Sequence, residues 1–149
     1  MKKGFTMIEL IFVIVILGIL AAVAIPKLAA TRDDAKISKI SSNLATLLSD
    51  AGSYYTSQGE ANWETAGNTW AIVTNVELDD NTQSIVGTVN IESAVGTACF
   101  EMTGSNDGNL TIKQVDTTGV ICNGAALVVG GISSTTGVVH QFGGVGVVR

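Results

Sequence analysis

The chain has 149 residues, a length that suits one modest globular domain plus an anchor, with a core small enough to need a cross-link. Its formal net charge of -5 is unevenly spread: residues 1–59 carry six Lys or Arg against four acids, whereas residues 60–149 carry two against nine. An acidic C-terminal part without a basic stripe among aromatic residues does not fit direct recognition of nucleic acid.

The N-terminal segment Phe5–Pro26 is apolar and is interrupted only by Thr6 and Glu9. As a helix, these 22 positions extend roughly 33 Å, which is enough to cross a bilayer. Lys2 and Lys3 precede the segment, and the positive-inside rule then keeps the first residues in the cytoplasm. The pattern predicts a single-pass inner-membrane precursor with its N-terminus inside and its C-terminus outside.

Two ordinary interpretations of this segment are a cleaved secretory signal, with Ala21–Ala24 as the small-residue site, and a plain uncleaved anchor. Neither explains Glu9, since an ionisable group inside the apolar segment costs on the order of 1 to 3 kcal/mol in lipid. Such a carboxylate should have a cationic partner.

The residues Lys2-Lys3-Gly4, followed by Phe5-Thr6-Met7-Ile8-Glu9-Leu10, closely resemble the class III prepilin leader shared by type IV pilins and type II secretion pseudopilins. The resemblance implies that a prepilin peptidase removes residues 1–4 by cutting after Gly4 and that the new N-terminus at Phe5 is methylated. The amine at Phe5 would then be the partner of Glu9, within one subunit or between neighbours. The apolar helix, residues 5–26, would stay in the mature chain as the core of a filament.

Gly18 and Pro26 lie where type IVa pilins often carry a Gly and a Pro. Pro removes a backbone hydrogen bond and Gly weakens a helix locally. One interpretation is a helix break, at which the segment between them loosens when packed in a filament. The other is that Gly18 permits close helix packing and Pro26 marks the membrane edge.

Residues 27–58 continue as an amphipathic helix, which ends before Gly59. Polar residues such as Lys36, Lys39 and Ser49 occupy the opposite face. We expect one helix from Phe5 to Gln58, whose apolar stripe packs on the remaining domain. The stripe steps by three and four through Ile37, Ile40, Leu44, Leu47, Ala51 and either Tyr54 or Tyr55.

Residues 59–149 are predicted to form a β-rich head, since they are rich in Val, Thr and Gly without a long helical period. Residues 60–80 are expected to hold at most a short helix. A hairpin is predicted from Ala98–Thr103 and Leu110–Val115, and further strands from Thr118–Cys122, Ala125–Val129 and Val138–Phe142. The expected fold is α+β: a pilin-like lollipop with one long N-terminal helix packed on a small antiparallel sheet.

Cys99 and Cys122 are the two cysteines of the chain, and both fall beside predicted strands in an exported domain. They are predicted to form a disulfide, the alternative being two reduced buried thiols. The loop Gly104–Asn109 suits a turn better than a calcium site, because Asp107 is its single carboxylate. His140 has no neighbouring catalytic pattern, so no metal, no cofactor and no catalytic residue is predicted.

Taken together, the sequence predicts a non-enzymatic subunit of a type IV pilus-like filament. Its expected partners are copies of itself, the prepilin peptidase and a pilus or secretion assembly machinery. One alternative is a pseudopilin of a type II secretion or DNA-uptake system. A second is a membrane-anchored periplasmic binding module that never polymerises, which leaves Glu9 unexplained.

Overall fold

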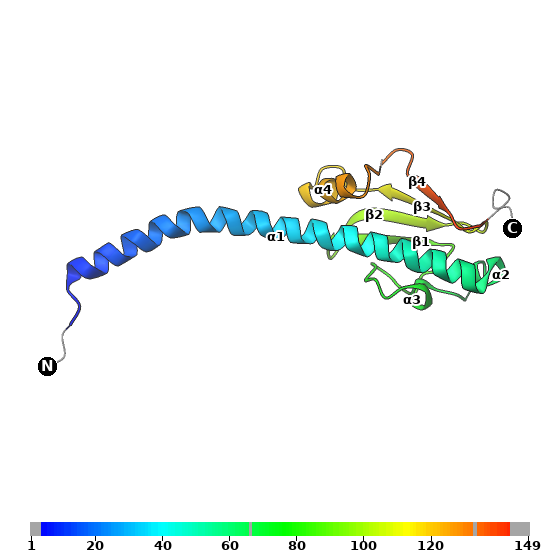
Figure 1. Ribbon diagram of the computed structural model, residues 1–149, viewed down its shortest axis with the longest axis horizontal. Coiled ribbons are helices and arrows are strands. Elements are labelled where there is room, and N and C mark those ends of the chain that lie inside the picture. The colour runs from blue at the N-terminus through cyan, green and yellow to red at the C-terminus, as the bar shows by residue number, and fades with distance from the viewer. Residues whose placement is uncertain (1–3, 66, 133, 144–149) are drawn as a thin grey trace. The chain divides into compact units, whose positions relative to one another are not determined.

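The computed structural model describes residues 4–65, 67–132 and 134–143 (Figure 1). Met1 to Lys3 of the expected leader lie outside these residues. The elements, in chain order, are α1 (Met7–Gln58), α2 (Glu60–Trp63), α3 (Trp70–Val73), β1 (Thr88–Ala94), β2 (Thr97–Gly104), β3 (Asn109–Gln114), α4 (Val120–Val128) and β4 (Val138–Gln141). The chain divides into two units, one up to Ala35 and one from Lys36 on, which are described separately.

The first unit holds the N-terminal part of α1, which is apolar up to Pro26 apart from Glu9 and exposes large apolar side chains on every face. The predicted helix from Phe5 to Gln58 is confirmed in its extent, except that it begins at Met7. The difference has a local cause, because Thr6 caps the helix and therefore stays outside it.

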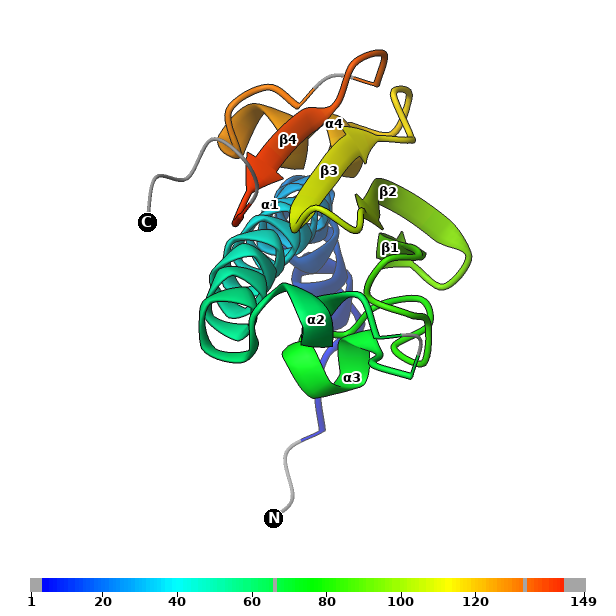
Figure 2. The same cartoon turned by 90° about the vertical axis from the view of Figure 1, so that its right-hand side faces the viewer.

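The second unit, called the head here, is built on an antiparallel sheet that contains four strands in the described residues, in the order β1-β2-β3-β4. Figure 2 shows the sheet on one side of the C-terminal part of α1. The predicted hairpin is confirmed as β2 and β3, with Met102 opposite Ile112. The predicted C-terminal strand is confirmed as β4, which pairs with β3. The α+β class predicted from the sequence is confirmed.

The core of the head lies between the sheet and the apolar stripe of α1. The predicted stripe is confirmed by the burial of its residues. Of the two tyrosines left open, Tyr55 is buried and Tyr54 is only partly buried. The buried stripe residues are Ile40, Leu44, Leu47, Ala51 and Tyr55. Alternating residues of β1, β2 and β3 pack with them in the core, namely Val89, Ile91, Phe100, Met102, Leu110 and Ile112.

Two predicted strands are wrong. Residues 120–128 form the helix α4, which covers most of Thr118–Cys122 and Ala125–Val129. The buried positions Cys122, Ala125 and Ala126 are spaced by three and one, which suits a helix face and not the alternation of a strand. The strands were predicted because the segment is rich in β-branched residues. It forms a helix instead, because a helix buries one of its faces.

The strand β1 was not predicted. Its buried residues Val89 and Ile91 alternate with less buried polar residues, which is the pattern of a strand with one face in the core. Residues 60–80 also contain two one-turn helices, α2 and α3, where at most one was expected. Each turn buries one tryptophan, and the Trp63 indole donates a hydrogen bond of 2.9 Å to the Ser105 carbonyl in the turn between β2 and β3. Burial of these two large rings explains the extra turn.

Candidate functional site

The candidate site is the start of α1, where a short non-helical stretch from Gly4 to Thr6 leads into the helix. The Thr6 backbone N–H donates to Glu9 Oε2 at 2.8 Å, and the Thr6 hydroxyl donates to the same oxygen at 2.7 Å. In return, the Glu9 N–H donates to Thr6 Oγ1 at 3.4 Å. These contacts form a capping box, in which an N-cap Thr and the Glu three residues later satisfy each other's backbone donors.

Thr6 is a residue that the sequence interpretation passed over, having treated it only as an interruption of the apolar segment. The signal was present in the sequence, because Thr-x-x-Glu directly before an apolar run is the pattern of a capping box. The capping box fixes where the Glu9 carboxylate lies. Its second oxygen, Oε1, accepts no hydrogen bond from the residues that the structure describes.

The Gly4–Phe5 junction lies outside the helix, and both residues are exposed, Phe5 at 90%. A non-helical, accessible backbone is the conformation in which proteolytic cleavage is favoured. Four residues separate Phe5 from Glu9, so a positive charge at Phe5 would be close to the carboxylate along the chain.

The residues Phe5–Pro26, here called the apolar band, expose large apolar side chains on every side of the helix. The helix α1 is long enough and apolar enough to span a membrane, judged by its length and composition. Large apolar side chains exposed all round are what a helix in lipid requires. The apolar band is therefore consistent with membrane anchoring.

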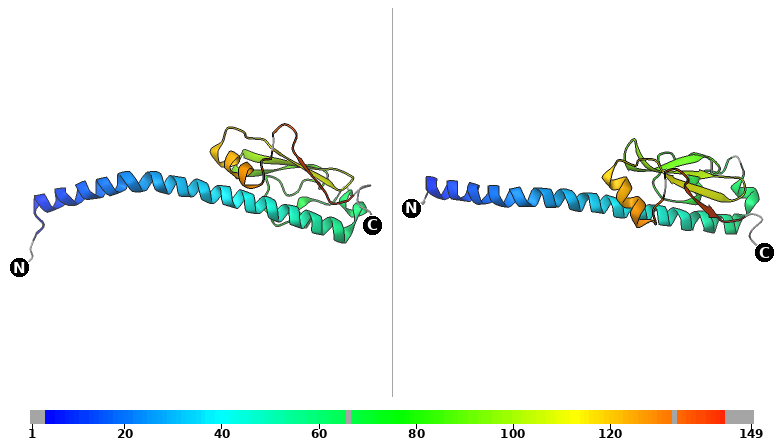
Figure 3. Two further views of the ribbon diagram at one scale, coloured as in Figure 1. Left: turned by 45° about the horizontal axis from the view of Figure 1, so that its top comes forward. Right: turned by 90° about the horizontal axis from the view of Figure 1, so that it is seen from above.

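Gly18 and Pro26 both lie inside α1, which continues through them without interruption (Figure 3). In the single chain there is thus no helix break at either residue. A Cβ added at Gly18 would meet nothing within 4 Å. Loosening of this segment inside a filament, or close packing of another helix at Gly18, stays a prediction.

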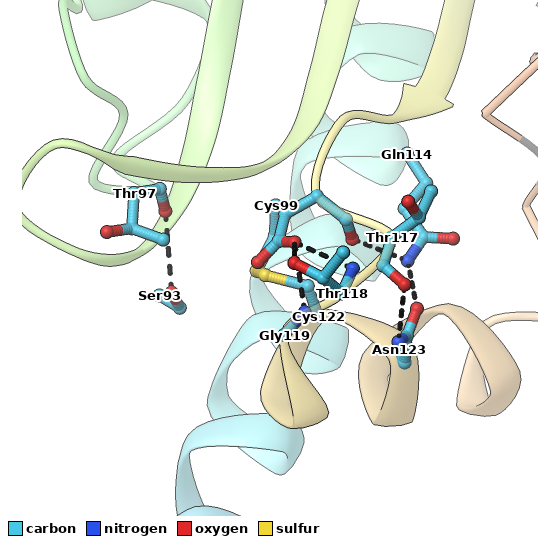
Figure 4. The surroundings of a disulfide bond; sticks show 10 residues. Ser93, Thr97, Cys99, Gln114, Thr117, Thr118, Gly119, Cys122 and Asn123 are labelled. Carbon is cyan, nitrogen blue, oxygen red and sulfur yellow. Dashed lines mark hydrogen bonds between the residues drawn. A yellow bond between two sulfur atoms is a disulfide. The ribbon is translucent and has the colours of Figure 1, made fainter.

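The predicted disulfide between Cys99 and Cys122 is present in the structure (Figure 4). It joins the beginning of β2 to α4, with 23 residues of separation along the chain. Beside it, the Gln114 amide donates to the Asn123 side-chain oxygen at 2.7 Å. The disulfide thus fixes a helix, and not the predicted strand, against the sheet.

Asp116 shapes the turn that leads into α4. Its Oδ1 accepts hydrogen bonds of 2.9 Å from the backbone N–H groups of Gly119 and Thr118 and from the Thr118 hydroxyl. These donors, the Gly119 amide first, hold the pKa of the Asp116 carboxyl below its usual value. The carboxylate therefore favours the bent path from β3 to α4.

The loop Gly104–Asn109 is the predicted turn between β2 and β3, closed by a bond of 2.9 Å from the Ser105 N–H to the Asn109 carbonyl. His140 lies on β4 opposite Leu110 and is half-buried. Within the described residues, no three His, Cys, Asp or Glu side chains are grouped so that they could hold a metal ion.

Comparison with known proteins adds one match. Residues 1–25 match the family described as the prokaryotic N-terminal methylation motif, which is the class III prepilin motif of type IV pilins and pseudopilins. No curated protein and no solved structure matches the chain. The motif implies processing by a prepilin peptidase and a pilus or secretion machinery, and it indicates a structural subunit.

Proposed function

We propose that this chain is the structural subunit of a type IV pilus-like filament, inserted in the inner membrane and polymerised through its N-terminal helix. One observation carries the proposal: a carboxylate, Glu9, is held by Thr6 in the first turn of α1, inside the otherwise apolar band and four residues after the Gly4–Phe5 junction. The match to the N-terminal methylation motif supports the same conclusion.

The proposed maturation begins with cleavage after Gly4, which removes residues 1–4, and methylation of the new amine at Phe5. Cleavage creates a cation where none existed in the precursor. Among the described residues of the precursor, the donors to the Glu9 carboxylate come from Thr6 and reach one of its oxygens. After cleavage, the free Oε1 can accept a charge-assisted hydrogen bond from an amine.

Assembly then pairs the Phe5 amine with Glu9 of a neighbouring copy. An unpaired carboxylate buried in a dry fibre core would cost about 3 to 5 kcal/mol, so the pairing registers each new subunit against the last. Contacts between different surfaces of identical copies generate a helical fibre when the rotation does not close. In this proposal, residues 5–26 form the fibre core. Residues 27–58 form the amphipathic helix that packs on the head, and residues 59–149 form the head itself.

The proposed orientation has the N-terminus in the cytoplasm and the head outside, because Lys2 and Lys3 precede the apolar band. A disulfide in the head suits an oxidising compartment. The assembled filament would lie in the periplasm or at the cell surface. The acidic head supports contact with proteins over direct contact with nucleic acid.

Mass spectrometry of material sheared from the cell surface and of the remaining membranes tests the proposal. Abundant sheared protein that begins with methylated Phe5 would establish a surface pilin. Processed protein confined to the envelope would favour a pseudopilin of a secretion or DNA-uptake system. An intact leader would overturn the proposed maturation and favour a plain anchored binding module.

The role of Glu9 is tested with two variants. Glu9→Ala removes the carboxylate, whereas Glu9→Gln keeps an oxygen that can accept from Thr6 but removes the charge. Both variants should be cleaved after Gly4 and should yield fewer fibres, because both lack the charge that pairs with the Phe5 amine. Normal fibre yield from Glu9→Gln would show that capping by Thr6, and not charge pairing, is the role of Glu9.

A further inference from the structure

The helix α4 exposes an apolar surface, here called the α4 patch: Val120 at 75%, Leu127 at 78% and Val128 at 66% exposure. Val120 and Leu127 are seven residues apart and so lie on the same helical face. The opposite face, with Cys122, is buried in the core. The nine-residue helix thus exposes three large apolar side chains, and apolar surface of this kind can mark a contact site.

The α4 patch is held rigidly. The disulfide joins α4 to β2, and Asn123 both accepts from Gln114 and donates to the Thr117 carbonyl at 2.9 Å. Gly124, which lies between Val120 and Leu127 on the same helical face, is so close to Ile37 that a Cβ would meet the Ile37 Cδ1 atom at 2.5 Å, so α1 adjoins the patch there. The patch is therefore presented in a fixed conformation, which lowers the entropic cost of binding.

Charge limits what can cover the α4 patch. Residues 117–148 contain no Lys, Arg, Asp or Glu, whereas residues 60–116 contain all nine acids of the C-terminal part. Figures 1 and 2 place α4 and β4 on one side of the head and α2 and α3 on the other. Two heads that met through their acidic surfaces would repel each other, so contact is favoured on the side of α4 and β4, where Asp116, four residues before Val120, is the nearest acid in sequence.

We propose that the α4 patch packs on a second copy of this chain, against the apolar band of its α1. The apolar band is the other extensive apolar surface among the described residues, and Glu9 is its single ionisable residue. Once a subunit leaves the lipid, the apolar band must be covered by apolar surface. This inference rests on the proposed filament and adds a contact that the pairing of Phe5 with Glu9 does not supply.

Photo-crosslinking in cells that make the full chain tests the contact. A photoreactive phenylalanine analogue is placed at Leu127, and at Ile72 as a matched control, because Ile72 is an exposed apolar residue at 56% on α3. We expect crosslinked dimers from position 127 and not from position 72. Trypsin releases the apolar band as one peptide ending at Lys27, so the attachment point can be read by mass spectrometry.

A crosslink from position 127 to that peptide supports the proposal. Crosslinks only to lipid, to another protein or to the head of a second copy would overturn it. The inference is decided in sheared fibres, where a missing crosslink from position 127 to the apolar band overturns it and leaves the proposed filament standing. Absence of the wild-type chain from sheared material would count against the proposed filament instead.

Leu127→Glu, compared with Ile72→Glu, provides a second test. A carboxylate in the α4 patch would have to be buried at the contact, and we expect fibre yield to fall roughly tenfold or more, the factor that corresponds to about 1.4 kcal/mol. Formation of the Cys99–Cys122 disulfide in both variants shows that the head has folded. Wild-type fibre yield from Leu127→Glu would overturn the inference.

Discussion

The Thr6 amide and the Thr6 hydroxyl both donate to the same oxygen of the Glu9 carboxylate. Thr6 and Glu9, the two polar residues of the apolar segment, are thus hydrogen-bond partners. In the proposed membrane anchor, Glu9 would therefore already have two of its hydrogen bonds. Its Oε1, which accepts from no described residue, would be available for the partner that the proposed cleavage creates.

Thr6→Ala should loosen the first turn of α1. Loss of an N-cap costs about 1 kcal/mol, which corresponds to roughly fivefold faster opening of that turn. The measurement is amide hydrogen exchange at Glu9 and Leu10 for the full chain in detergent micelles, since the Leu10 N–H bonds to the Thr6 carbonyl. Thr6→Ser keeps the hydroxyl and should behave like wild type, whereas equal exchange in Thr6→Ala would show that the capping box contributes nothing.

Replacing both cysteines by serine should destabilise the head by about 3 kcal/mol, because the disulfide closes a 23-residue separation in the unfolded chain. Denaturant unfolding followed by the fluorescence of the buried Trp63 and Trp70 measures the change. Reduced wild-type protein is the control and should unfold with the double variant. Superimposable curves for oxidised wild type and the double variant would contradict this account.

Gly108→Ala and Gly96→Ala form a matched pair. Both glycines have positive φ, +68° and +79°, and both lie in hairpin turns, but only a Cβ at Gly108 would overlap the Tyr55 ring. We expect Gly96→Ala to cost about 1 kcal/mol from backbone strain. Gly108→Ala should cost roughly 1 to 3 kcal/mol more, because the overlap displaces a buried ring. Equal stability of the two variants in denaturant would mean that Tyr55 moves aside freely.

The Asp116 carboxylate should make the stability of the head depend on pH in the acid range. Its pKa is lowered in the folded state, by the Gly119 amide first, so the stability that it contributes is present above its unfolded pKa of about 3.9. That contribution is lost as pH falls through the lower, folded pKa. The stability gap between wild type and Asp116→Ala should therefore be constant from about pH 7 to about pH 5 and shrink at lower pH.

The control for this experiment is Asp107→Ala, because Asp107 is exposed and makes no hydrogen bond to the described residues. Its stability gap to wild type should be small at every pH. A gap for Asp116→Ala that stayed unchanged down to about pH 3 would show that the Asp116 carboxylate makes the same bonds when protonated.

Part of the candidate site could be predicted from local sequence alone. Glu9 stood out as an acid in an apolar segment, and the residues around Gly4 and Phe5 carry a short linear motif that the family match confirms. The capping by Thr6 was equally local and was missed, because the apolar segment was interpreted as a membrane span before its first turn was considered as a helix end.

By itself, the sequence determined the features that depend on neighbours along the chain: the long helix, its apolar stripe, and the hairpin of β2 and β3. The tertiary structure decided the rest. Residues 120–128 became a helix because one face, with Cys122, Ala125 and Ala126, could be buried in the core, despite their β-branched composition. Tyr55, and not Tyr54, entered the core because Gly108 and Gly143 leave room for its ring. These choices depend on which distant residues supply space and apolar contact, and local propensities are too small to override that burial.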